Sequence, residues 1–200
     1  MSVKLDQRSK EKTALKTEGL IYKTIFVLNI FCIVAGTAVS IKNIFNPASG
    51  ILMRAGGILT IIAFLVAAIY VFKGYTKTAA ICFKLFTAAF AFSLILSIIG
   101  AAQISIIPAI FEGLSLVLVV VIALKKDFGK SNSFSVCGII AILAIANIIE
   151  VIKLNPGVKL SGNNYESLVL GRSIAQFLLS YLFGIITYAK YLDKESRGTK

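Results

Sequence analysis

Six stretches of the chain are each about 20 residues long and almost wholly apolar, which is the length that a helix needs to cross a lipid bilayer. They are Tyr22–Ile41, Gly50–Phe72, Thr78–Ile99, Ile106–Leu124, Phe134–Ile152 and Ser167–Ala189. With 58% hydrophobic residues and a mean hydropathy of +0.89, the 200 residues carry more apolar surface than a soluble domain could bury. The fold class predicted is therefore all-α, a polytopic membrane bundle of six transmembrane helices.

The connections between these stretches are too short and too apolar to separate two domains. We expect a basic cytoplasmic N-terminal tail over residues 1–20, one six-helix transmembrane domain over residues 21–190, and a cytoplasmic C-terminal tail over residues 191–200. The N-terminal tail mixes charges of both signs and has no apolar run, so we expect it to lie against anionic headgroups.

The net charge of +12 is explained by topology rather than by nucleic acid. Sixteen of the 21 Lys and Arg residues belong to the tails, the second and fourth connections and the helix ends beside them, and five fall on the other side. Cytoplasmic loops are the ones enriched in Lys and Arg. Both termini are predicted to be cytoplasmic, in a multi-pass protein of a cell membrane, with a bacterial plasma membrane expected.

Four ionisable side chains of the apolar stretches fall in the outer half or at the midplane of the predicted bundle, namely Arg54, Glu112, Glu150 and Arg172. A charge at the centre of a membrane helix costs at least about 2.5–3.5 kcal/mol on insertion scales, so each should face a partner or water. Glu112 is the deepest of them. Pro108, four residues earlier, lacks a backbone N–H and is expected to open the helix beside this carboxylate.

Two further polar residues accompany the charged ones. Asn147 lies on the same helix face as Glu150, and Gln176 follows Arg172 in a stripe that continues through Ser180, Gly184 and Thr187. The candidate substrate-binding residues are therefore Glu112, Arg172, Arg54, Glu150, Asn147 and Gln176. Two interpretations remain open: two acid–arginine ion pairs that hold four helices in register, or a polar cavity in the outer half of the bundle.

Several chemistries lack the residues that they need. The chain has no histidine and no tryptophan, and its cysteines Cys32, Cys82 and Cys137 lie in or beside apolar stretches without a CxxC motif. No GxSxG, Walker A or paired metal-binding carboxylates occur. We expect no enzymatic activity, no cofactor and no metal, and no nucleic-acid partner.

Two functions fit a chain of this kind. The first is a small-solute transporter, or the membrane-embedded solute-binding subunit of one. In its six-helix plan and size the chain is similar to the substrate-binding components of energy-coupling-factor transporters, which implies a small-molecule solute and a separate energising subunit. The second is a non-transporting accessory, assembly or immunity protein that packs against another membrane protein. The longest connection, Lys153–Glu166, is either a lid over an outer cavity or an ordinary loop.

Overall fold

The computed structural model describes residues 2–73, 76–102, 105–125 and 129–198, and every long element in this part of the chain is an α-helix. The helices are α1 (Ser2–Ile44), α2 (Ile51–Lys73), α3 (Ala79–Ala101), α4 (Ile106–Leu124), α5 (Lys130–Leu154) and α6 (Tyr165–Gly198), with a short 3₁₀ turn, η1 (Thr76–Thr78), before α3. Each contains a segment long and apolar enough to span a membrane. The predicted six-helix fold is confirmed. Most boundaries shift by a few residues, but the first helix begins at Ser2 and the last continues to Gly198.

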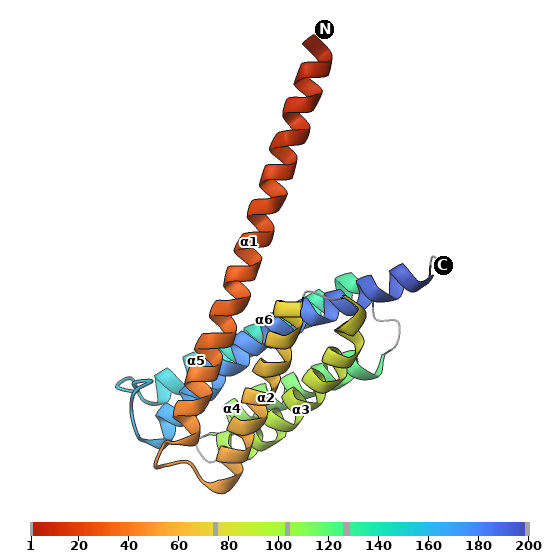
Figure 1. Ribbon diagram of the computed structural model, residues 1–200. Coiled ribbons are helices and arrows are strands. Elements are labelled where there is room, and N and C mark those ends of the chain that lie inside the picture. Colours follow the sequence, from red (N-terminus) through yellow and green to blue (C-terminus); the bar gives the residue numbers. More distant parts are fainter. Residues whose placement is uncertain (1, 74–75, 103–104, 126–128, 199–200) are drawn as a thin grey trace.

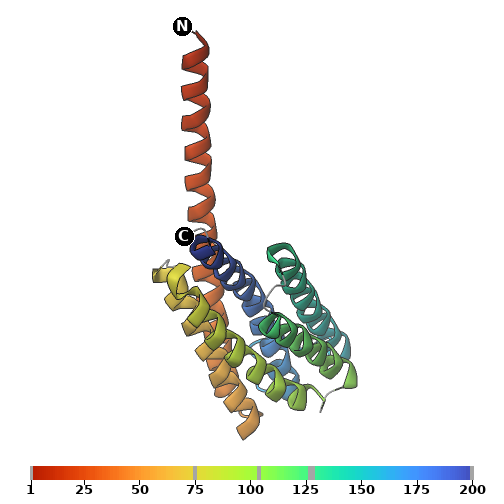
Figure 2. The ribbon, with the colours of Figure 1, turned by 90° about the vertical axis from the view of Figure 1, so that its right-hand side faces the viewer.

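The last helix, α6, lies at the centre of the bundle. It packs against α1, α2, α3 and α5, and Figure 2 shows it between α1–α3 on one side and α4–α5 on the other. Its spanning segment is 72% buried, against 28% for those of α1 and α4, and has the lowest mean hydropathy of the six, 1.6. A helix surrounded by protein does not need a lipid-like surface, so small and polar residues such as Ser173, Ser180 and Gly184 lie at its buried positions.

An aromatic cluster fills the half of the bundle nearest the chain termini. Phe83, Phe86 and Phe90 of α3 surround Phe183 of α6, with ring centroids 5.7–5.9 Å from Phe183 in stacked and edge-on arrangements. Phe86, Phe90 and Phe183 are completely buried. Aromatic pairs in these geometries stabilise a core beyond the area that they bury. This half of the bundle is therefore a solid, apolar packing region.

The first helix extends far beyond the bundle. It has 43 residues, which corresponds to about 65 Å, roughly twice the thickness of a bilayer core. Its apolar second half packs against α2 and α6, and its charged first half projects away from the other helices (Figure 1). The segment expected to be a tail is thus a helical continuation of the first transmembrane helix.

The loop between α5 and α6 is fixed to the loop between α1 and α2. Lys42 Nζ donates to the carbonyl oxygen of Gly162 at 2.5 Å, and Asn46 Nδ2 donates to the carbonyl oxygens of Gly162 and Asn164 at 3.4 and 3.5 Å. These bonds agree with an ordinary connection rather than a free lid. The short, uncharged connection Gly100–Ser105 predicts a tight hairpin between the third and fourth helices, but residues 103–104 of it lie outside the described residues.

Candidate functional site

Arg172 brings a charge into the bundle from the first third of α6. Its Nη2 donates to the backbone carbonyl of Met53 on α2 at 2.7 Å. About one turn later on α2 is Gly56, where a Cβ would overlap the guanidinium group. A glycine is therefore needed for Arg172 to approach the α2 backbone. Arg172 Nη1 is buried and has no hydrogen-bond partner among the described residues.

Glu112 is completely buried in α4. Asn147 of α5, also completely buried, donates from Nδ2 to Glu112 Oε1 at 3.1 Å. The second carboxyl oxygen, Oε2, and the amide oxygen of Asn147 have no partner within the part of the chain that the structure describes. Glu112 is thus joined to a neutral amide rather than to an arginine.

The expected effect of Pro108 on this helix was wrong. The helix α4 begins at Ile106, with the Ser105 side chain accepting a hydrogen bond from the Ile107 amide, so Pro108 lies in its first turn. Amides in the first turn have no partner within a helix, and a proline there removes no hydrogen bond. Pro108 therefore does not open the helix beside Glu112.

Four of the six predicted residues lie in one part of the bundle. Arg172 is near enough to Glu112 for their charges to interact, and Ser97 of α3 is near the same carboxyl group, although no ion pair joins the two described charged side chains. Gln176 follows Arg172 by about one turn of α6, and together with Arg172 and Ser97 it lines a small cavity that is described below. We call Glu112, Asn147, Arg172 and Ser97 the polar centre.

The other two predicted residues lie elsewhere. Arg54 is exposed at the start of α2. Glu150 lies near the surface of α5 and forms an ion pair with Lys153, one turn later on the same helix, with 3.8 Å between Nζ and Oε2. The interpretation of two acid–arginine ion pairs is therefore wrong, because in the described structure Glu150 pairs with Lys153 and Glu112 is bonded to Asn147.

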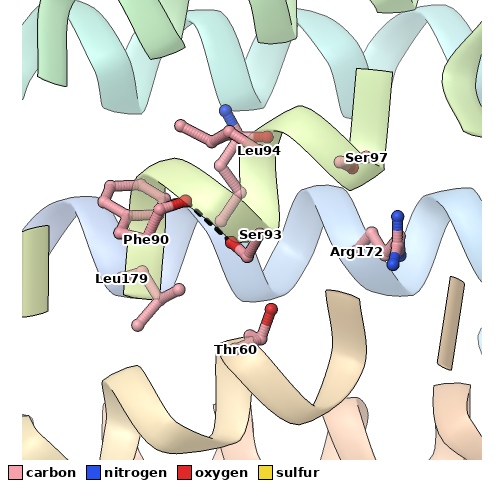
Figure 3. A pocket seen from close by; sticks show the side chains of 8 residues that line it. Thr60, Phe90, Ser93, Leu94, Ser97, Arg172 and Leu179 are labelled. Atoms are coloured by element: carbon pink, nitrogen blue, oxygen red, sulfur yellow. Dashed lines mark hydrogen bonds between the residues drawn. The ribbon is translucent and has the colours of Figure 1, made fainter. Parts of the chain in front are cut away.

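A small cavity adjoins the polar centre. Its lining residues come from α2, α3 and α6 and are Thr60, Phe90, Ser93, Leu94, Ser97, Arg172, Gln176 and Leu179. Figure 3 shows Arg172 at one end and Phe90 and Leu179 at the other. The cavity has a volume of about 20 Å³ open to the centre of a water molecule, so it has room for about one water.

A larger hollow lies nearer the end of the bundle opposite the termini. It has a volume of about 350 Å³ and lies between the start of α2, the end of α3 and the start of α6. We call it the vestibule; its lining is Ala48, Gly50, Ile51, Leu52, Met53, Leu96, Ile99, Gly100 and Tyr165. The Tyr165 hydroxyl donates to the Gly100 carbonyl at 2.6 Å. The Arg172–Met53 hydrogen bond connects a residue of the inner cavity to one of the vestibule.

Sequence reasoning did not find several residues of this region. The hydroxyls of Thr60, Ser93 and Ser97 were not singled out, because serine and threonine are common in membrane helices. The spacing of four residues between Ser93 and Ser97 was an available signal, since it places both on one face of α3. Gly56 could not be assigned without knowing which side chain approaches it.

The fold and the spanning helices define the chain as a multi-pass integral membrane protein. No protein-family model matches the chain, and no curated protein and no solved structure matches it either. The functional interpretation therefore depends on the polar centre and the vestibule.

Proposed function

We propose that the protein is a small-solute transporter or the membrane-embedded solute-binding subunit of a transporter. The observation that supports this proposal best is the sequence of hollows along the bundle. A largely apolar vestibule lies at one end. Arg172 donates a hydrogen bond to the carbonyl of Met53 in the vestibule lining, and it also lines the small inner cavity together with hydroxyl and amide groups. Buried ionisable groups in membrane helices are expensive and are typical of solute and ion pathways.

The vestibule suggests what kind of solute would bind. Its volume lies at the lower end of the range of ligand pockets, which begins at about 300 Å³. Its walls are mostly aliphatic, with the Tyr165 hydroxyl as a polar group. Arg172 is bonded to the carbonyl of Met53 in this lining and still has an unpartnered Nη1 within the described chain. A compact molecule with an apolar body and one anionic or carbonyl group would fit both features.

Release of a solute towards the chain termini requires a different conformation. The inner cavity holds about one water molecule, and the aromatic cluster fills the bundle beyond it. A transporter would have to separate α2 from α6 and break the Arg172–Met53 hydrogen bond. A binding subunit needs no such opening in isolation, because a partner would drive release. The sequence contains no Walker A motif, so active transport needs a partner or an ion gradient.

Purification from native membranes tests this proposal. The protein is extracted in mild detergent, small molecules released from it are identified by mass spectrometry, and those molecules are tested for flux in proteoliposomes. We expect Arg172→Gln to lose the bound molecule and Arg54→Gln to retain it, because Arg172 is bonded to Met53 of the vestibule lining and lines the inner cavity, whereas Arg54 is exposed. Equal retention by both variants, or recovery of lipid alone together with no flux, would contradict the proposal.

The orientation of the vestibule is part of the same proposal. If both termini are cytoplasmic, as the distribution of Lys and Arg predicts, the vestibule opens to the outside. All three native cysteines are buried, so single exposed cysteines can report topology. We expect a membrane-impermeant maleimide to label Ser161→Cys in intact cells and Asn132→Cys only after permeabilisation. The reverse pattern would invert the orientation.

The projecting half of α1 favours a second function, that of an accessory protein. A polar helix that extends about 30 Å beyond a bundle gains little stability alone and suits contact with a partner. Deletion of residues 2–19 should then release a copurifying membrane protein. In a solute carrier the same deletion should leave the bound molecule in place. The two readouts therefore separate the two functions.

A further inference from the structure

Two buried acceptor atoms in the polar centre have no donor. Glu112 and Asn147 are completely buried and share one hydrogen bond, from Asn147 Nδ2 to Glu112 Oε1. Glu112 Oε2 and Asn147 Oδ1 remain unpartnered in the described structure. If Glu112 is ionised, both atoms can only accept, and a buried polar atom without a partner is costly. A single hydrogen atom placed between these two oxygen atoms would satisfy both of them.

One proton supplies that donor. We propose that Glu112 binds a proton on Oε2 and shares it with Asn147. The new O–H group donates to Asn147 Oδ1 while Asn147 Nδ2 continues to donate to Oε1, so that carboxyl and amide form a closed pair of hydrogen bonds. The proton comes from water, and no other bond forms or breaks. Both orphan acceptors are satisfied by this single event.

The groups around Glu112 provide the alternative, proton-free state. The neighbouring α3 presents Ser97, α5 presents Asn147, and α6 presents Arg172 and Tyr165, whose hydroxyl already donates to Gly100. Arg172 is the cation that acts on Glu112, and its Nη1 is a donor without a partner among the described residues. An ionised Glu112 is therefore drawn towards Arg172, and a protonated one towards Asn147.

Ser97 lies beside both this pair and the inner cavity, although it forms no hydrogen bond with Glu112 in the described structure. It faces the Glu112 carboxyl group and also lines the inner cavity, which has room for about one water molecule. A proton can thus reach Glu112 by way of the cavity. In the transport function on which this part of the inference rests, the proton is the coupling ion. The binding of the proton itself does not depend on that function.

Difference infrared spectroscopy on the full-length protein in detergent tests proton binding directly, with the proton as the only ligand. Over a pH titration, we expect wild type and Glu150→Gln to show the carbonyl stretch of a buried, protonated carboxyl group. Glu112→Gln should lack it. Asn147→Leu should move it to higher frequency, because the carbonyl oxygen loses the hydrogen bond from Nδ2. Persistence of the signal in Glu112→Gln, or its absence from wild type throughout the folded range, overturns the inference.

Glu112→Gln also tests the closed pair through stability. The glutamine amide can donate to Asn147 Oδ1 in place of the proton, so this variant should fold and denature thermally within a few degrees of wild type. Glu112→Ala should denature at a clearly lower temperature. A Glu112→Gln protein that does not fold contradicts the pairing. If the infrared signal behaves as expected while no solute binds or moves, the proton site stands and the proposed transport function fails.

Discussion

The two halves of the bundle differ in how completely their interiors are filled. In the half nearest the termini, Phe83, Phe86, Phe90 and Phe183 pack ring against ring. In the other half, the interior holds Glu112, Asn147 and Arg172 with unpartnered atoms in the described structure, beside two hollows. The comparison indicates that the aromatic half holds the helices together, whereas the polar half has the space and the unpartnered groups that the proposed solute and proton would need.

The largest effect is expected in the aromatic half. Phe183→Ala removes a completely buried ring that contacts three others, and loss of a buried phenylalanine costs about 3–5 kcal/mol. Phe92→Ala is the matched control, because Phe92 belongs to the same helix, α3, as three rings of the cluster but is 58% exposed. Thermal denaturation in detergent compares the two. Similar stabilities would mean that the aromatic cluster does not anchor the bundle.

A smaller effect is expected where Arg172 approaches α2. Gly56→Ala places a methyl group against the guanidinium group and should displace it from the Met53 carbonyl, at a cost of about 1–3 kcal/mol. Gly113→Ala is the control, because a Cβ there meets no heavy atom of the described chain within 4 Å. Denaturation temperature and retention of any copurified molecule are measured for both. Equal results for the two variants would show that the Arg172–Met53 hydrogen bond contributes neither to stability nor to retention of the molecule.

The smallest effect is expected at Glu150. Its ion pair with Lys153 links one turn of a single helix, and the lysine side chain is 69% exposed. Such pairs contribute about 0.5 kcal/mol. Glu150→Gln should therefore leave the denaturation temperature nearly unchanged at low and high salt. A loss comparable to that of Glu112→Ala would place Glu150 in the polar centre and break the distinction between the two acids.

The spanning helices were predictable because a bilayer imposes a length and an apolarity that are visible in each stretch. The difference between the two acids was partly predictable as well. Glu150 has Lys153 within reach on its own helix, whereas Ile106–Leu124 contains no Lys or Arg, so Glu112 needed a partner from another helix.

The identity of that partner was beyond the sequence. Whether Glu112 meets Asn147 or Arg172 depends on how each helix is rotated about its axis and where it crosses its neighbours. The contact of Arg172 with the Met53 carbonyl is equally hidden, because backbone acceptors exist at every position of α2. The lack of an effect of Pro108 could have been predicted, because the apolar stretch Ile106–Leu124 already placed this proline in the first turn of its helix.

The continuous first helix gives the molecule a lever. Because α1 is helical from Ser2 to Ile44, a torque applied to its projecting half is carried along the same rod into the bundle. Near the other end of that rod, the Asn43 side chain lies so close to Gly171 that a Cβ at Gly171 would collide with it. Gly171 precedes Arg172 in the chain. A rotation of the outer segment about the helix axis would therefore move Asn43 against Gly171, the residue that precedes Arg172 of the polar centre.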